Sequence, residues 1–225
     1  MKYLLNIHTS TETAIVNICD ERKVLTTLIN TEQKQHAAFL HSAIRQILSD
    51  NNIKANELKA IGVTGGPGSY TGIRIGMATA KGLCYALKIP LLLFNTLEVM
   101  ALSAIESIGD KKALYCPLID ARRQEVFTGV YNYELDEVSP PSSMILNENS
   151  FNILLQEFPV YFFGSGSEKF KLLAKNITET FFIDGPDITS QALFNFSLTK
   201  FQNSSFENPY QAQPLYIKNF YLAKN

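Results

Sequence analysis

The chain has 225 residues, of which 46% are hydrophobic and 18% charged, and its net charge is −1. This balance is typical of a globular protein with a substantial core. It excludes a protein whose whole surface attracts nucleic acid, so any contact with tRNA or DNA would be local or made indirectly through a partner. The cysteines Cys19, Cys84 and Cys116 lack metal-binding spacing, which favours a reducing compartment. Without a signal peptide or an apolar run of membrane length, we expect a cytoplasmic protein that does not cross a membrane.

Strand and helix signals follow one another in a regular order along the first half of the chain. Period-2 or continuous apolar runs predict strands, and helical periodicity predicts helices. The predicted elements are strands 2–8, 13–19 and 23–30, helix 35–50, strand 59–64, helix 72–88, strand 90–94 and a helix from Thr96 that ends at Gly109.

The second half repeats this order. Its predicted elements are strands 113–119, 124–133 and a weak one at 143–147, helix 150–157, strand 160–164, helix 167–176, strand 180–183 and helix 189–203. The duplicated βββαβαβα order predicts an α/β protein with two similar lobes, 1–109 and 110–225, and a cleft between them, as in the actin, sugar-kinase and Hsp70-ATPase superfamily (ASKHA fold). We expect the tail from about residue 204 to pack back across the lobes. Such a fold hosts many functions, so it decides none by itself.

A glycine-rich turn joins strand 59–64 to helix 72–88. Its residues are Gly66, Pro67, Gly68, Ser69, Thr71 and Gly72, with Arg74 following in the helix. A glycine turn at a helix N-terminus can expose backbone N–H groups to a phosphate. However, the sequence matches neither the Walker loop, G-x-x-x-x-G-K-[ST], nor the dinucleotide fingerprint, G-x-G-x-x-G. Close approach of another backbone segment would require the same glycines, so both explanations stay open.

Helices 35–50 and 72–88 are apolar over more of their circumference than one sheet face can cover. The exception in the second of them is a narrow polar strip: Arg74, Lys81, Tyr85 and Lys88. We expect the two helices to form a subunit interface, a four-helix contact in which Gly72, Gly76 and Ala80 let backbones come close. The predicted interface residues are His36, Phe39, Leu40, Ala43, Ile73, Gly76, Met77, Ala80, Lys81 and Cys84. Alternatively, the rest of the same chain covers these faces.

No arrangement of titratable residues in the sequence points to a catalytic or metal site. His36 and His41 are five residues apart, so they do not share a helix face as zinc ligands do. His8 follows the first strand, where an ATP-using protein of this fold would need a carboxylate for Mg²⁺. The corresponding turn of the second half carries a charged group: Asp120, Arg122 and Glu125. These three residues either brace the loop or form an exposed charge group, and we predict no catalytic residue and no metal site.

The tail carries aromatic residues between lysines. They are Tyr210, Tyr216, Phe220 and Tyr221, with Lys218 and Lys224. Such a tail either stacks nucleic-acid bases or packs back across a lobe, and we favour packing.

Four segments of the chain resemble the bacterial TsaB (YeaZ) family. Residues 66–76, GPGSYTGIRIG, followed by AKGL at 80–83, are similar to the family's G-P-G-S-[FY]-T-G-[LIV]-R-[IV]-G segment. Residues 36–40, HAAFL, resemble its E-H-[ST]-x-x-L helix start, and 120–127, DARRQEVF, its D-A-R-x-x-E-V-[FY]. Residues 214–218, PLYIK, resemble its terminal P-x-Y-[LI]-[RK]. The resemblance therefore spans nearly the whole chain.

The resemblance implies a two-lobed, non-catalytic dimerisation or scaffold subunit. Members of the family pair with the paralogue TsaD, together with the ATPase TsaE, to place threonylcarbamoyl on the adenosine beside the anticodon of ANN-reading tRNAs. ATP, Mg²⁺ and metal are then expected on the partner subunits, with no cofactor on this chain. Pairing, including a possible homodimer, would use the two helices above, and the loop with Arg122 would serve the complex. The alternative is an ATP-dependent kinase or acyl-phosphate transferase of the same fold that acts alone.

Two positions depart from the family pattern. The family has Asp-Thr-[AS] after the first strand, where this chain has His8, Thr9 and Ser10, which weakens any expectation of ATP binding. Gln35 stands in place of the acidic residue before the helix histidine, which affects only a cap or interface contact.

Overall fold

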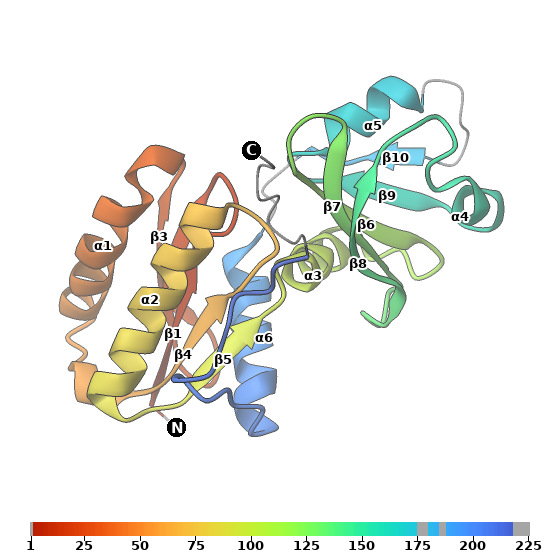
Figure 1. Ribbon diagram of the computed structural model, residues 1–225. Coiled ribbons are helices and arrows are strands. Elements are labelled where there is room, and N and C mark those ends of the chain that lie inside the picture. The colour runs from red at the N-terminus through yellow and green to blue at the C-terminus, as the bar shows by residue number, and fades with distance from the viewer. Residues whose placement is uncertain (1, 175–179, 185–187, 218–225) are drawn as a thin grey trace, which may run out of the picture.

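The computed structural model describes residues 2–174, 180–184 and 188–217, arranged as two lobes (Figure 1). The first half of the chain forms β1 (Tyr3–His8), β2 (Ala14–Cys19), β3 (Val24–Asn30), η1 (Gln33–Gln35), α1 (His36–Asp50), η2 (Ala55–Glu57), β4 (Leu58–Thr64), α2 (Tyr70–Leu87), β5 (Leu91–Phe94) and α3 (Thr96–Ile108). The second half forms β6 (Leu114–Asp120), β7 (Glu125–Tyr131), β8 (Glu137–Ile145), α4 (Asn152–Glu157), β9 (Val160–Phe163), α5 (Ser167–Leu173), β10 (Thr180–Phe182) and α6 (Ser190–Gln202).

The two sheets have the same strand order. It is β3-β2-β1-β4-β5 in the first lobe and β8-β7-β6-β9-β10 in the second. In each lobe the central strand pairs antiparallel with the next strand and parallel with the fourth. Helices cover both faces of β1, which explains its buried apolar run of Leu4, Leu5 and Ile7. This duplication confirms the predicted two-lobed fold of the actin/Hsp70-ATPase type.

Strand β8 is longer than its sequence predicts. Only 143–147 carries a strand signal, whereas the strand runs over Glu137–Ile145 and includes Pro140 and Pro141. Proline cannot donate to a ladder, so it argues against a strand except at a sheet edge. Strand β8 is an edge strand of its sheet, and it can therefore contain both prolines.

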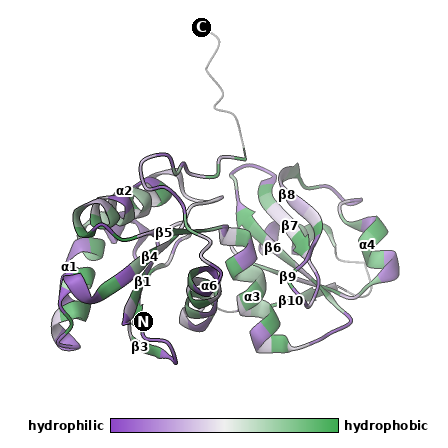
Figure 2. Cartoon of the chain, turned by 90° about the horizontal axis from the view of Figure 1, so that it is seen from below, coloured by the Kyte–Doolittle hydropathy of each residue, from purple (hydrophilic) through white to green (hydrophobic). Residues whose placement is uncertain are grey.

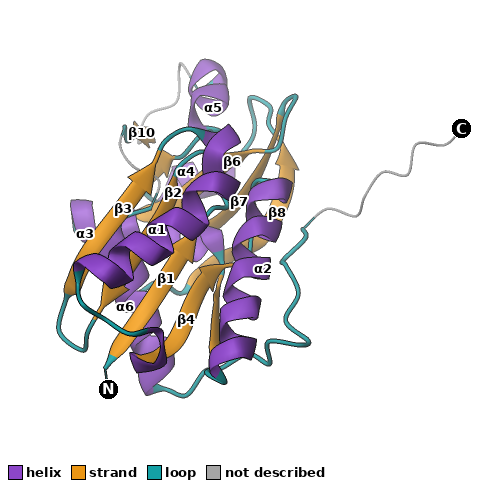
Figure 3. Cartoon of the chain, turned by 90° about the vertical axis from the view of Figure 1, so that its left-hand side faces the viewer, coloured by secondary structure: helices purple, strands orange, loops and turns teal. Residues whose placement is uncertain are grey.

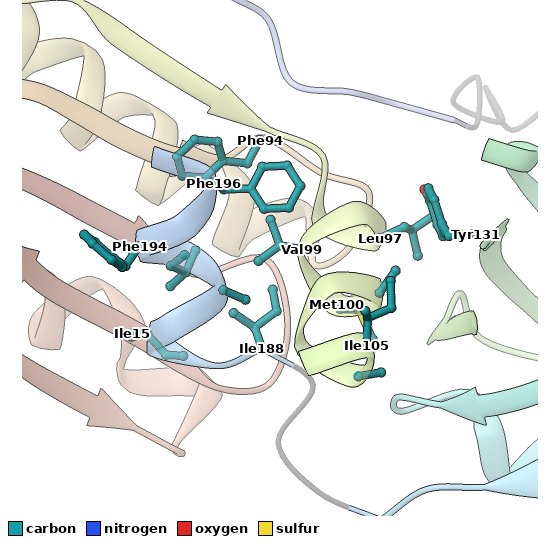
Figure 4. Packing of buried hydrophobic residues seen from close by; sticks show 14 of the residues in the cluster. Ile15, Phe94, Leu97, Val99, Met100, Ile105, Tyr131, Ile188, Phe194 and Phe196 are labelled. Atoms are coloured by element: carbon teal, nitrogen blue, oxygen red, sulfur yellow. The ribbon is translucent and has the colours of Figure 1, made fainter. Parts of the chain in front are cut away.

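Helices α3 and α6 cross over between the lobes, so the structure differs from a simple division at residue 109. Helix α3 packs against β6 and β7 of the second sheet, while α6 packs on the first sheet and against α3. Figure 2 shows the two helices between the sheets. In Figure 4, Val99 of α3 faces Phe196 of α6, and Leu97 lies on the side of Tyr131 of β7.

Polar contacts fix α6 on the first sheet. The Asn6 side-chain amide donates to Ser197 Oγ at 3.1 Å, and the Asn17 amide donates to the Ser190 carbonyl at 3.1 Å. Because buried donors are costly without partners, these bonds favour one placement of the helix.

Helices α1 and α2 lie side by side on the outer face of the first sheet (Figure 3). The described part of the tail, 204–217, runs back over the first lobe beside α2. Glu207 forms an isolated antiparallel β-bridge with Leu91, and the Leu215 N–H donates to the Gly65 carbonyl at 2.7 Å. Phe220, Tyr221, Lys218 and Lys224, which the sequence analysis singled out, lie outside the described residues. None of the helices that the structure describes is long and apolar enough to cross a membrane.

Candidate functional site

The glycine turn packs against the loop that follows β1. A Cβ at Gly68 would lie 2.0 Å from the Ser10 carbonyl oxygen, and one at Gly72 would lie 2.0 Å from that of Thr9. The Ser69 N–H also donates to the Ser10 carbonyl at 2.7 Å. The two segments therefore touch backbone to backbone, and this contact accounts for both glycines.

The rest of the turn connects to β5, to α3 and to the tail. The Gly65 N–H donates to the Phe94 carbonyl at 2.8 Å, and the Gly65 carbonyl accepts from the Leu215 N–H of the tail. Gly66 has φ +114°, a backbone conformation that favours glycine, and its carbonyl accepts from the Thr96 N–H at 2.8 Å. Pro67 is buried beside it, and the Ser69 hydroxyl caps α2 by accepting from the Gly72 N–H. Thr71 is exposed at the start of α2. The turn thus contacts the loop after β1, strand β5, the start of α3 and the tail.

His8 ends β1 and is fully buried. Both ring nitrogens are hydrogen-bonded, Nδ1 with Thr64 Oγ1 and Nε2 with Thr11 Oγ1, each at 2.9 Å. Burial, helped by the nearby His36, lowers the pKa of His8 to about 3. The imidazole is therefore neutral at physiological pH and is held in place by two hydroxyls.

The buried His8 should make folding sensitive to acid. Between pH 6.5, the ordinary histidine pKa, and about 3, the unfolded chain binds a proton that the folded chain does not. The contribution of the neutral His8 to the free energy of unfolding is therefore fully present above pH 6.5. It should fall by roughly 1 kcal/mol per pH unit below that value. Urea unfolding at pH 6.5 and 4.5 should show a shallower loss for His8→Asn than for the wild type. His41→Gln, on the exposed side of α1, is the control, and equal slopes for His8→Asn and wild type would contradict the assignment.

The equivalent position in the second lobe is Asp120, at the end of β6. Its carboxylate accepts from Lys169 Nζ at 2.6 Å and from the Arg122 N–H, and Lys169 also donates to the Glu125 carbonyl at 3.2 Å. The Ser165 hydroxyl accepts from the Asp120 N–H at 3.1 Å. This geometry favours the loop-bracing interpretation of the charged group. Lys169 was not identified from the sequence.

Removing the Lys169 brace should destabilise this hairpin. Lys169 is largely buried, with 20% of its side chain exposed, so Lys169→Met should lower the free energy of unfolding by about 1 kcal/mol. Lys171→Met removes an exposed pair with Glu168 on the same helix and should change stability by less than about 0.5 kcal/mol. Equal effects of the two variants in urea unfolding would contradict the bracing role.

A polar cleft of about 590 Å³ lies where the two turns face each other. Its walls are residues of both lobes: Ser10, Thr11, Glu12, Gln33, Gly68, Ser69, Tyr70, Thr71, Ile119, Asp120, Ala121, Arg122, Phe127 and Ser165. The exposed Arg122 has φ +69° at the tip of the β6–β7 turn, at the edge of this cleft. Among the described residues no three His, Cys, Asp or Glu side chains come together as metal ligands.

The predicted interface residues are mostly buried inside the single chain. Eight of the ten face its own core: His36, Leu40, Ala43, Ile73, Gly76, Met77, Ala80 and Cys84. In the single chain these side chains hold α1 and α2 on the sheet, and pairing with a partner through the two helices stays a prediction. Gly76, for example, allows contact with Thr9, whose Oγ1 would lie 2.4 Å from an added Cβ. Phe39 is partly exposed, and Lys81 donates to the Ala212 carbonyl at 2.9 Å.

A different set of residues forms the exposed side of these helices. We call it the outer helical face, and it consists of Ala37, Ala38, His41, Ser42 and Arg45 of α1 with Thr71, Ala78, Gly82 and Ala86 of α2. Ala78, Gly82 and Ala86 are spaced four residues apart and so lie on one side of α2. A Cβ at Gly82 would meet nothing within 4 Å. The α2 part of the face therefore carries small side chains, which suit a close helix–helix contact.

Two lobes with the same strand order and a polar cleft between them define a two-lobed α/β protein of the actin/Hsp70-ATPase class. Residues 23–200 match the family model of TsaD, tRNA N6-adenosine threonylcarbamoyltransferase. The Bacillus subtilis tRNA threonylcarbamoyladenosine biosynthesis protein TsaB is 32% identical over 180 residues, which cover 79% of this chain and 77% of that protein. The chain therefore belongs to the TsaB (YeaZ) family, within the TsaD-like proteins that the matched model describes.

Other relatives agree with this assignment. The tRNA N6-adenosine threonylcarbamoyltransferase of Rickettsia prowazekii is 34% identical over 120 residues, which cover 46% of this chain and 31% of that enzyme. The solved structure of YeaZ from Pseudomonas aeruginosa superposes with a TM-score of 0.79 at 23% identity, covering 96% of this chain and all of that one. That likeness supports the fold.

Proposed function

We propose that this chain is a non-catalytic scaffold subunit in tRNA threonylcarbamoyladenosine biosynthesis. The observation that carries the proposal is the state of the two side chains that end the central strands. His8 is neutral and bonded to two hydroxyls, and Asp120 is bonded to Lys169. An imidazole is a poor Mg²⁺ ligand, and the Asp120 carboxylate is already paired with a cation, so these two positions do not supply the facing pair of carboxylates that would hold Mg²⁺ in an ATP-using protein of this fold.

The proposed partner is a TsaD transferase. This chain and the Rickettsia transferase are similar in sequence over 120 residues, so the two kinds of subunit carry comparable segments. Related subunits can pair through equivalent surfaces in a pseudo-symmetric contact. The outer helical face supports this arrangement, because the small side chains of its α2 part let a second helix pair approach. A homodimer through the same face is the corresponding self-association. We further propose that the ATPase TsaE joins the complex and that ATP, Mg²⁺ and any metal are bound by the partner subunits.

Mixing experiments test the proposal. The purified chain and a TsaD partner should co-elute from gel filtration as a one-to-one complex. Calorimetry of the isolated chain with Mg-ATP should show weak binding or none. Tight binding with turnover would instead favour an ATP-dependent kinase or acyl-phosphate transferase, for which the polar cleft of about 590 Å³ offers enough room.

A further inference from the structure

One flank of α2 carries basic and aromatic residues along most of its length. Positions 70, 74, 81 and 85 fall within a narrow strip of the helix, since each residue advances by about 100°, and Lys88 follows directly as the C-cap. The tail lies along this flank: Tyr210 contacts Tyr85, Ala212 contacts Lys81, and Tyr216 contacts Tyr70 and Arg74. We call this surface the basic-aromatic strip, and it consists of Tyr70, Arg74, Lys81 and Tyr85 of α2, Lys88 directly after the helix, and Tyr210 and Tyr216 of the tail.

The positive charges of the strip are not neutralised. Arg74 Nε donates to the Tyr216 hydroxyl at 3.0 Å, and its guanidinium lies 3.8 Å from the centre of the Tyr70 ring. Lys81 Nζ donates to a backbone carbonyl. These acceptors are uncharged, and among the described residues the three strip cations form no ion pair. The carboxylate within 204–217 is that of Glu207, near β5. The strip is therefore a local positive patch on a chain whose net charge is −1.

The tyrosine rings of the strip are exposed in pairs. Tyr85 is 65% exposed and Tyr210 74% exposed, with ring centres 5.7 Å apart in an edge-to-face contact. Tyr70 and Tyr216 form a second pair with ring centres 5.8 Å apart. Rings on the surface that still contact each other are positioned in advance, so they lose little freedom when a flat ligand stacks on them.

We propose that the basic-aromatic strip binds a single-stranded segment of RNA. Unneutralised cations attract phosphates, and exposed tyrosines offer stacking platforms for unpaired bases. Both features are present on one line about 27 Å long, the length of an 18-residue helix. Bases inside a duplex are already stacked, so a duplex would use only the charges. The proposal rests on the proposed function, since it assigns a tRNA contact to a subunit of a tRNA-modifying complex.

Fluorescence anisotropy with a labelled 12-nucleotide single strand of mixed A and U, and with a duplex of equal length, tests the proposal on the full chain. The chain should bind the single strand more tightly than the duplex. Tyr85→Ala and Tyr210→Ala should each weaken single-strand binding about tenfold. Lys88→Asn should lower the slope of log affinity against log salt by about 0.7. Asparagine suits position 88 because that residue has φ +55°.

Matched controls are Phe158→Ala, which removes an exposed ring from the second lobe, and Lys112→Gln, which removes an exposed lysine. Equal binding of strand and duplex, or equal loss from controls and strip variants, would overturn the proposal. Gel filtration with the TsaD partner separates the two proposals. Tyrosine variants that lose RNA but still pair support the strip. Variants that lose only pairing identify a protein contact and overturn it. Failure of the wild-type chain to pair counts against the proposed function alone.

Discussion

Gly72→Ala should unfold the first lobe, whereas Gly82→Ala in the same helix should stabilise it. The new Cβ at Gly72 would lie 2.0 Å from the Thr9 carbonyl oxygen, a backbone atom that cannot move without shifting the loop after β1. We expect a loss of about 4 kcal/mol or more, in the range that breaks marginally stable domains. At Gly82 nothing lies within 4 Å, so alanine should add about 0.5–1 kcal/mol through helix propensity alone.

Urea unfolding followed by circular dichroism measures both effects. Because each variant adds one methyl group to α2, the pair controls for the chemistry of the substitution. Similar midpoints for Gly72→Ala and the wild type would show that the glycine turn and the loop after β1 are not in backbone contact.

Gly82→Arg should abolish pairing with the TsaD partner without unfolding the chain. The position is open in the single chain, so the long charged side chain projects into solvent. In a complex it would separate the two helix pairs and bring an unpaired charge into the contact. We expect affinity to fall at least a hundredfold, measured by calorimetry or gel filtration.

Two other arginine substitutions make this result specific. Leu172→Arg changes an exposed residue of α5 on the other lobe and should leave pairing intact. Ala80→Arg changes a buried residue of α2 and should unfold the chain. If Gly82→Arg folds and pairs as the wild type does, the outer helical face is not the docking surface.

The order of elements could be predicted from the sequence because the apolar periodicity of most elements is strong. The two prolines in β8 hid part of that strand, since their effect depends on whether a strand is central or at an edge, and pairing order is a property of the whole sheet. The exchange of α3 and α6 between lobes had no local signal either.

The interface prediction shows what a helical pattern leaves undetermined. The apolar width of α2 correctly indicated that much of the helix is covered, yet it did not indicate by what. The sheet, α1 and the returning tail cover it, and Gly76 and Ala80 face Thr9 and the core. Ala78, Gly82 and Ala86 are equally small and stay exposed, and the sequence pattern alone did not distinguish them from the buried positions.

At the cleft, the sequence identified His8 and Asp120 but not their partners. Lys169 lies 49 residues from Asp120, and a lysine on a short amphipathic helix carries no sign of its contact. Thr64 and Thr11 likewise became relevant only when β4 and the loop after β1 were placed side by side.

The most direct test is a titration of this chain into a fixed amount of TsaD, with TsaE, ATP and unmodified tRNA, while the transfer of labelled threonylcarbamoyl is followed. A scaffold subunit predicts a rate that rises until the chain and TsaD are equimolar and then stays constant, with no product when TsaD is omitted. A rate that keeps rising in proportion to this chain beyond equimolarity, or product formed without TsaD, would contradict the account.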